Sequence, residues 1–337
     1  MAIVVNETRT RQVRFRCATG PGVGLGHVSR CLGLAELFED AAGVRPGFVV
    51  SSSSARAMAL IRGAGFSCTK RRGDDLPHDA DGLAGPLHDN DIVIIDDYGL
   101  TRDYVRRLKR NVACRVLVVD DMTRWNTGLV DWVLALPTGS SSDSYGKTRA
   151  FCGPEYLPLR RAFRTARTRV VTDGDVCLIV LGGRATPSLM RWAVEGASRS
   201  FSRLRVAFTS SAGKRLPSVQ SSCRVELLPP LPDLAAEIAR SSACVCTGGL
   251  TKYECVALET PAVVIDQPGL EHRDTLRLQR SGMLAGVVPA MDSQKLAAAL
   301  SDLRSRPLRL ALQERLHDAG IGRGVTGMVA EILRRTW

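Results

Sequence analysis

The chain has 337 residues, of which 45% are hydrophobic and 24% are charged. These ordinary globular proportions exclude a disordered chain and a disulfide-stapled miniprotein, and the length suits two domains. The 46 lysines and arginines exceed the 34 acidic residues by 12. This excess favours an anionic partner (nucleic acid, a membrane surface or a phosphate-bearing small molecule), unless it reflects arginines spread over solvated faces.

The ten cysteines form no C-x-x-C pair, and most lie in apolar runs, as Cys177 does, where cysteine behaves as a small buried hydrophobe. The N-terminal residues lack the pattern of a signal peptide, and no apolar stretch is long enough to span a bilayer. No cluster of cysteine and histidine suggests a metal site. We therefore expect a soluble protein of a reducing cytoplasm that binds no metal.

The first half of the chain alternates short apolar runs with helical patterns. Glycine-rich Gly20–Gly26 separates a first strand from a helix whose apolar residues recur at helical spacing. Continuous apolar runs suit parallel strands that are buried on both faces. The predicted strands are Val13–Ala18, Phe48–Ser51, Ile92–Ile95 and Val116–Val119, with further helices at Ser54–Gly63 and Thr101–Lys109. This order predicts a doubly wound α/β domain.

Two unusual stretches follow. Thr138–Lys147 is rich in serine and is predicted to be a flexible loop. Pro158–Arg169 contains five arginines. We interpret it as the connection between two domains, although a solvated cationic helix explains the same composition.

The alternation then starts again, which predicts a second Rossmann-like unit. Its predicted strands are Cys177–Leu181, Arg205–Phe208, Val225–Leu228, Cys244–Cys246 and Ala262–Ile265. Its predicted helices are Ser188–Ser198, Leu231–Arg240, Leu250–Leu258, His272–Ser281 and an amphipathic C-terminal helix, Pro307–Trp337, that docks on one domain or on both. We expect domains at 1–165 and 166–337, with the carboxyl ends of both sets of strands facing one ligand-binding cleft.

The first motif, Gly20–Leu32, reads GPGVGLGHVSRCL. Gly24 and Gly26 let the backbone approach a ligand, although their spacing is not that of a dinucleotide fingerprint. His27 stands at the predicted helix start, where the helix dipole disfavours its protonated form. It is therefore a candidate general base or neutral hydrogen-bonding group, and a structural histidine that caps the loop is the alternative.

The second motif, Thr247–Glu254, reads TGGLTKYE and follows a predicted strand. Gly248 and Gly249 permit close approach, Thr251 offers a hydroxyl, and the Glu254 carboxylate can accept two hydrogen bonds from a ribose diol. Together they indicate a nucleoside-diphosphate site. The alternative is that Glu254 serves only as a first-turn partner of the helix dipole.

These motifs resemble the UDP-sugar hydrolases of the pseudaminic-acid pathway and the related spore-coat polysaccharide proteins. The second motif is also similar to the nucleotide end of the lipid-intermediate N-acetylglucosaminyltransferase of peptidoglycan synthesis. The matching segments, all within residues 15–282, are Gly24–Ala35, Asp96–Gly99, Val119–Asp121, Gly153–Phe163, Gly182–Gly183 and Gly248–Glu254. The resemblance implies a GT-B fold with two facing Rossmann-like domains, a UDP-sugar substrate, inversion at the anomeric carbon, and neither an obligatory metal nor another cofactor.

The resemblance also assigns roles. His27 becomes the active-site histidine, in the loop that contains Gly24 and Gly26. The donor UDP-sugar is held by residues of the second domain: Gly248, Gly249 and Thr251 at the diphosphate, Glu254 at the ribose, Gly182 and Gly183 on the phosphate side, and Leu231 near the uracil.

The departures from the family pattern point to a changed reaction. Ala18 stands where the family has the aspartate of an R-x-D motif, and Leu270 and Glu271 replace an Asn-Gln pair. Those polar groups are plausible positioners of the sugar and the attacking water, so their loss favours another nucleophile.

The replacement loop brings Glu271, His272 and Arg273 to the expected cleft. There Arg273 can pair with a carboxylate on the sugar, such as a uronate, although a surface charge explains it equally. Asp97 and Asp121 follow predicted strands and join His27 as candidate catalytic bases.

We favour an inverting, metal-independent glycosyltransferase that uses a UDP-sugar such as UDP-glucuronate. Its acceptor is a small molecule, for example cytosine, as in the cytosylglucuronate synthases of nucleoside-antibiotic biosynthesis. The alternative is a hydrolase in which water attacks a UDP-linked deoxy-amino sugar. A non-catalytic binder of nucleotide sugars or nucleic acid fits less well, because the arginines are dispersed and aromatic residues total only 5%. We expect no nucleic-acid partner and no integral membrane segment, and we leave a homodimer open.

Overall fold

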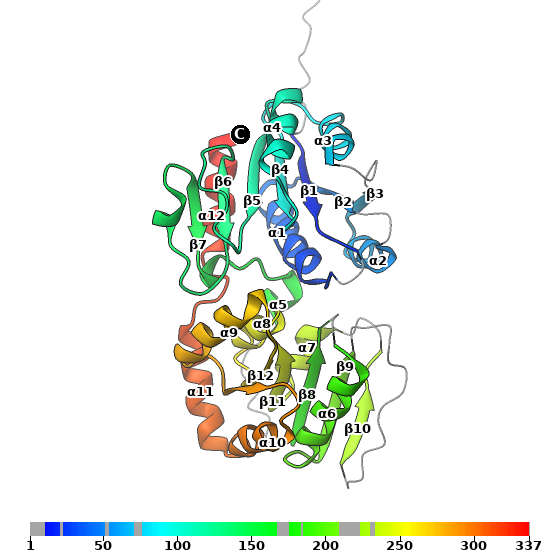
Figure 1. The fold of residues 1–337 in the computed structure, drawn as a ribbon, viewed down its shortest axis with the longest axis vertical. Helices are drawn as coiled ribbons and strands as arrows, with labels where there is room; N and C mark the ends of the chain where they lie inside the picture. The colour runs from blue at the N-terminus through cyan, green and yellow to red at the C-terminus, as the bar shows by residue number, and fades with distance from the viewer. Residues whose placement is uncertain are drawn as a thin grey trace, which may run out of the picture.

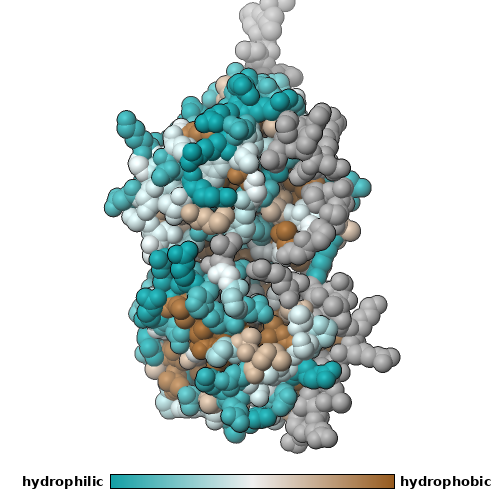
Figure 2. Space-filling model, viewed as in Figure 1, coloured by the Kyte–Doolittle hydropathy of each residue, from teal (hydrophilic) through white to brown (hydrophobic). Residues whose placement is uncertain are grey.

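The structure, a computed structural model, describes residues 11–20, 23–50, 54–70, 76–166, 175–182, 185–208, 223–229 and 233–336. Within these ranges the chain forms two lobes, each built on one parallel sheet (Figure 1). The predicted pair of doubly wound α/β domains is therefore confirmed. The space-filling view shows hydrophilic residues over much of the described surface of one face, with hydrophobic residues in separate patches (Figure 2).

The first lobe has the strand order β3-β2-β1-β4-β5-β6-β7, and every neighbouring pair is parallel. Its strands are β1 (Val13–Cys17), β2 (Gly47–Val50), β3 (Ser67–Lys70), β4 (Ile92–Asp96), β5 (Arg115–Val119), β6 (Trp132–Ala135) and β7 (Arg149–Cys152). Its helices are α1 (Gly26–Ala42), α2 (Ala55–Gly63), α3 (Leu76–Ala84), α4 (Arg102–Asn111) and α5 (Arg161–Thr165), with 3-10 turns η1 (Ser142–Tyr145) and η2 (Pro154–Tyr156).

The central strand β4 shows why the strand runs are apolar throughout. Ile92 and Ile94 belong to the hydrophobic core that contains α1, whereas Val93 and Ile95 belong to the core on the opposite face, with α4. All four are fully buried. A strand covered on both faces needs apolar residues at every position, because successive side chains point to opposite faces.

The second lobe repeats this plan with the order β10-β9-β8-β11-β12-β13, again wholly parallel. Its strands are β8 (Val176–Leu181), β9 (Arg203–Phe208), β10 (Arg224–Leu227), β11 (Ala243–Thr247), β12 (Ala262–Asp266) and β13 (Gly286–Pro289). The helices that follow in the chain are α6 (Pro187–Ser198), α7 (Leu234–Ala239), α8 (Thr251–Ala257), α9 (Leu270–Arg280), α10 (Ser293–Asp302), α11 (Arg306–Asp318) and α12 (Val325–Thr336).

The carboxyl ends of both sets of strands face the junction between the lobes (Figure 1). In each sheet the strand order reverses once, between β1 and β4 in the first lobe and between β8 and β11 in the second. Such switch points are where open α/β sheets bind ligands. Both sequence motifs follow strands at these points.

Several elements differ from the predictions. The strands β3, β6, β7 and β13 and the helices α3 and α10 are not predicted from the sequence patterns. The segment Thr138–Lys147, predicted to be a flexible loop, contains the turn η1, and Tyr145 within it is only 1% exposed. The Tyr145 hydroxyl donates a hydrogen bond to the Asp120 carbonyl over 3.2 Å, which anchors this segment to the first lobe.

The predicted single C-terminal helix is wrong. Pro307–Trp337 spans two helices, α11 and α12, separated by a turn in which Gly320 and Gly322 adopt positive φ. In Figure 1, α11 lies on the second lobe and α12 returns to the first, where it packs against α1. The Arg149 guanidinium donates to the Glu331 carboxylate over 2.9 Å and ties α12 to β7.

The connection between the lobes packs directly on α1. A Cβ atom at Gly33 would lie 2.7 Å from the Leu159 carbonyl carbon and nearer still to the Pro158 carbonyl oxygen. Only glycine therefore lets the helix and the connecting backbone approach this closely.

We expect Gly33→Ala to lower the free energy of unfolding by roughly 1–3 kcal/mol, because backbone must move to admit the methyl group. Gly63→Ala is the matched control on α2, since a Cβ there meets nothing within 4 Å. That change should raise stability by roughly 0.5–1 kcal/mol. Denaturant unfolding measures both, and equal effects of the two substitutions would contradict the close contact at Gly33.

Candidate functional site

The centre of the first-lobe site is a histidine paired with a buried aspartate. His27 lies in the first turn of α1, and its Nδ1 is 2.7 Å from Oδ1 of Asp96 at the end of β4. The Asp96 side chain is fully buried, while that of His27 is 14% exposed. A carboxylate that accepts the Nδ1 proton leaves the lone pair on Nε2, and an imidazole in this state can accept a proton from a ligand.

Arg30, one turn further along α1, completes the pairing of Asp96. Its guanidinium donates to both Asp96 oxygens, over 2.5 and 2.6 Å, and to Oδ2 of Asp121 over 2.8 Å. Burial by itself would raise the pKa of the Asp96 carboxyl, but the positive charge of Arg30 and the hydrogen bonds from Arg30 and His27 hold that pKa well below its usual range. Asp96 is therefore ionised and serves as the fixed partner of His27.

Tyr98 joins this network from the loop after β4. Its ring meets the His27 ring edge to face, with the centroids 4.7 Å apart, and its hydroxyl donates to Oδ2 of Asp121 over 2.7 Å. Burial and the negative charge of Asp121 raise the pKa of the Tyr98 hydroxyl, so it stays protonated. The other Asp121 oxygen, Oδ1, is buried and has no hydrogen-bond partner among the described residues.

The two neighbouring aspartates have mainly structural contacts. Asp97 accepts from Arg16 over 2.5 Å on one oxygen and from the Gly99 amide over 2.7 Å on the other. Asp120 accepts three backbone amides of the following loop and fixes its course. The Ala18 amide donates to the Asp96 carbonyl over 2.8 Å, so Ala18 lies next to the His27–Asp96 dyad.

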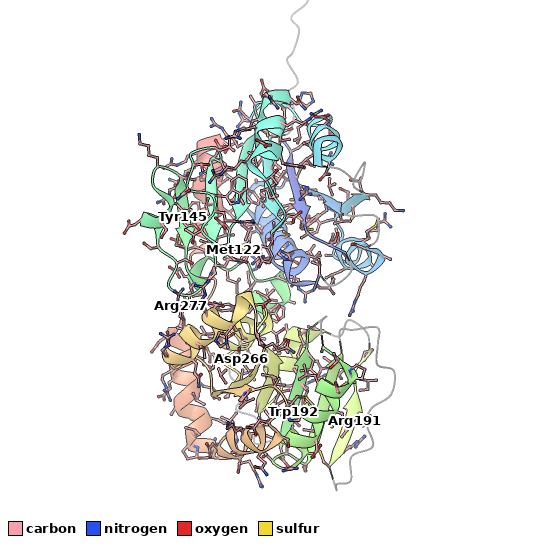
Figure 3. All side chains as sticks on the ribbon, viewed as in Figure 1. Met122, Tyr145, Arg191, Trp192, Asp266 and Arg277 are labelled. Atoms are coloured by element: carbon pink, nitrogen blue, oxygen red, sulfur yellow. The ribbon has the colours of Figure 1, made fainter. Side chains whose placement is uncertain are left out.

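A pocket of about 280 Å³ adjoins the network. It is lined by Leu100, Arg102, Thr123, Arg124, Trp125 and Asn126. Arg124, one of the lining residues, donates from its guanidinium to the Tyr98 carbonyl over 2.8 Å. Met122, in the loop that leads to this pocket, lies on the side of the first lobe that faces the junction (Figure 3).

The glycines divide into packed and open positions. Cβ atoms at Gly24, Gly26 and Gly249 would meet nothing within 4 Å, which leaves space for a ligand to approach the backbone. Gly248 is packed against α9, because a Cβ there would lie 3.0 Å from the Thr275 hydroxyl. Two further predicted positions, Gly183 and Leu231, lie outside the described residues, and a Cβ at Gly182 would lie 3.2 Å from the Thr247 hydroxyl.

Glu254 is a buried carboxyl on α8, only 4% exposed. Burial raises its pKa to about 7, although the charge of Arg160 and a hydrogen bond from Thr251 act in the opposite direction. Near neutral pH both the neutral and the ionised form of the Glu254 carboxyl are therefore populated. Arg160 belongs to the connection between the lobes, so a positive charge from outside the second sheet acts to lower the pKa of Glu254.

The three residues predicted on α9 lie in different surroundings. The Glu271 Cβ would be 3.3 Å from a Cβ at Gly248, which places Glu271 beside the glycine loop. Nδ1 of His272 lies 2.7 Å from the carboxylate of Asp266, at the end of β12. Arg273 is exposed.

A contact between the lobes was not anticipated from the sequence. Oδ1 of Asp274 accepts from the Thr138 amide of the first lobe over 2.8 Å and from the Tyr253 hydroxyl over 2.7 Å. Arg277 donates to the Thr138 carbonyl over 3.0 Å, and Figure 3 shows it at the junction. Thr138 lies 136 residues from Asp274, so no local pattern signals this pairing.

The described residues show neither a metal-binding cluster nor a membrane-spanning helix. They contain no group of three or more His, Cys, Asp or Glu side chains arranged to hold a metal ion. Among the described helices, none is both long and apolar enough to cross a membrane.

Comparison with known sequences gives distant relatives. No model of a known protein family matches the chain. It is 22% identical over 258 residues to the spore coat polysaccharide biosynthesis protein SpsG of Bacillus subtilis, which covers 71% of this chain and 75% of SpsG. It is also 22% identical over 200 residues to the uncharacterized protein MJ1062 of Methanocaldococcus jannaschii, covering 54% of this chain and 41% of that relative. The predicted resemblance to spore-coat polysaccharide proteins is thus confirmed.

Comparison with solved structures identifies the fold. The calicheamicin glycosyltransferase CalG4 matches 97% of this chain and 99% of its own, with a TM-score of 0.60 and 15% identity. MurG of Acinetobacter baumannii matches 96% of this chain and 99% of its own, with a TM-score of 0.60 and 14% identity. The glycosyltransferase of kitacinnamycin matches equally well, at 15% identity. The chain therefore has the GT-B glycosyltransferase fold, as predicted.

The raised pKa of Glu254 predicts a pH-dependent stability. An unfolded chain releases this proton near its ordinary pKa of 4.5, whereas the folded protein holds it to about 7. Between these values the unfolded state binds fewer protons, so stability falls as pH rises. Relative to Glu254→Gln, the wild-type free energy of unfolding should fall by up to about 3 kcal/mol from pH 4.5 to 7.5. Urea unfolding at a series of pH values measures this, and parallel pH profiles for the two proteins would contradict it.

Proposed function

We propose that this chain is an inverting, metal-independent glycosyltransferase that transfers a sugar from a UDP-sugar to a small acceptor. The observation that carries the proposal is the His27–Asp96 dyad, in a GT-B fold whose second lobe presents the glycine loop Gly248–Gly249 toward the same junction. A proton acceptor on one lobe and a donor site on the other are the two parts that such a transfer needs.

In the proposed reaction, an acceptor N–H or O–H lies at Nε2 of His27. As the acceptor atom forms its bond to the anomeric carbon, the bond from that carbon to the UDP oxygen breaks. The acceptor proton moves to Nε2, and the ionised Asp96 stabilises the resulting imidazolium. Backbone amides of the glycine loop and the Thr251 hydroxyl stabilise the departing diphosphate, and Glu254 binds the ribose.

We assign the proton transfer to His27 because both Asp97 oxygens are engaged, with Arg16 and with the Gly99 amide. Asp121 is the second candidate, since its Oδ1 has no partner in the part of the chain that is described. The pocket beside Tyr98, with its volume of about 280 Å³, is the space we propose for a small acceptor.

The substrates we propose are UDP-glucuronate and a nucleobase such as cytosine. Arg273 is exposed on α9 and is free of ion pairs with the described residues, so it is available to a uronate carboxylate. Ala18 favours transfer over hydrolysis, because the family's carboxylate beside the dyad, a candidate for orienting water, is absent. Water attack by the same dyad remains the alternative that the first experiment decides.

With UDP-glucuronate alone, we expect slow release of UDP, and a large acceleration when cytosine is added. A coupled assay for free UDP measures both rates. Fast release without any acceptor would establish the hydrolase instead. A panel of other UDP-sugars and nucleobases, run in parallel, separates a wrong choice of substrate from a wrong reaction.

The His27–Asp96 dyad predicts a loss of activity in each of two variants. His27→Ala should lower kcat by about 100- to 10,000-fold because the proton acceptor is removed. Asp96→Asn should lower it comparably because the imidazole tautomer is no longer fixed. UDP binding, measured by calorimetry, should change little in either variant. Asp131→Asn is the control, since Asp131 pairs with Lys109 and Arg115 of the same lobe outside the network. Undiminished turnover in His27→Ala would remove His27 from the mechanism.

A further inference from the structure

Beneath the glycine loop lies a buried lysine that the proposed reaction does not use. Lys252 is 2% exposed, and its Nζ lies 2.8 Å from Oδ2 of Asp274. The same ammonium donates a hydrogen bond to the Gly248 carbonyl oxygen. Lysine is rarely buried unless it is paired, and a buried ion pair is a weak source of stability. Its contact with the loop therefore points to a role there.

The direction of the Gly248 carbonyl fixes the direction of the next amide. A trans peptide is planar, so its C=O and its N–H point to opposite sides. Because the Gly248 carbonyl is turned toward the buried ammonium, the Gly249 N–H is turned away from it. A Cβ at Gly249 would meet nothing within 4 Å, whereas one at Gly248 would meet α9. The loop therefore has a packed inner side and an open outer side.

We propose that Lys252 is a positioning residue for the donor diphosphate. By holding the Gly248 carbonyl inward, it keeps the Gly249 amide pointed at the open side, where that amide donates to a diphosphate oxygen. Asp274 neutralises the ammonium, so Lys252 acts by orienting the peptide rather than by long-range attraction. This inference rests on the proposed function, because it assigns a task within the same donor site.

The lysine is also linked to the junction between the lobes. Asp274 uses Oδ2 for Lys252 and Oδ1 for the Thr138 amide of the first lobe. The Asp274 carboxylate therefore holds the donor loop through Lys252 and also contacts the first lobe through Thr138. Methionine, which is of similar length, cannot reproduce this because it has no N–H to donate to the Gly248 carbonyl.

Comparison of UDP with uridine tests the role of Lys252. For Lys252→Met we expect the Kd of UDP to rise about tenfold, the loss of one well-placed hydrogen bond to an anion, and the Kd of uridine to stay unchanged because it carries no phosphate. Calorimetry measures both ligands. Lys109→Met is the control, since Lys109 forms a partly buried ion pair with Asp131 in the other lobe.

Lys252→Met removes the positive charge paired with Asp274, so this variant alone can fail to fold. The double variant Lys252→Met/Asp274→Asn removes both charges and retains acceptors for Thr138 and Tyr253. We expect it to fold and still to lose affinity for UDP relative to uridine. A folded variant with an unchanged ratio of the two affinities overturns the role of Lys252 and leaves the proposed function intact. A wild-type protein that does not bind UDP overturns both.

Discussion

The negative charge of Asp96, buried at the end of β4, sets the arrangement of the first-lobe site. An unpaired carboxylate in that position would be prohibitively unstable, so positive and hydrogen-bonding groups must dock on it. His27 and Arg30 do so from one face of α1, which fixes the start of that helix against the sheet. Arg30 then reaches Asp121, and Asp121 receives Tyr98. One charge thus aligns the loops after three neighbouring strands and also selects the tautomer of the candidate base.

The position of a strand in its sheet explains part of how well the sequence predicts it. In β4 and β8 nearly every residue is apolar and buried, because both faces are covered, and such a run is visible in one sequence. The interior strand β6 is the exception, because all four of its residues are buried and yet it is not predicted. β3 lies at an edge, and three of its four residues are exposed, so Ser67–Lys70 resembles a loop. The return of α12 to the first lobe is equally hidden, because amphipathic periodicity shows that a helix has an apolar face but not which sheet covers it.

The residues of the candidate site also differ in how far the sequence alone predicts them. Residues in short motifs, such as His27 and Gly249, are recognisable because the loop and the following helix are contiguous in sequence. The contacts of Asp274 with Thr138 and of Arg30 with Asp121 join distant segments, and only the fold brings them together. The net charge of +12 is likewise hard to interpret from composition alone. Arg16, Arg30 and Arg164 contribute to it, yet each is engaged with carboxylates of the chain itself.

The backbone passes between the lobes twice, and the two passages lie side by side. The Gly322 amide donates to the Pro154 carbonyl over 3.1 Å, and the Gly324 amide donates to the Glu155 carbonyl over 2.8 Å. The two backbone connections between the lobes are thus hydrogen-bonded to each other. The first lobe also contains two distant parts of the sequence, residues 13–165 and α12. A fragment that stops after α5 would leave the surface of α1 that α12 covers open to solvent, so the two lobes are separate in architecture but not as independent lengths of chain.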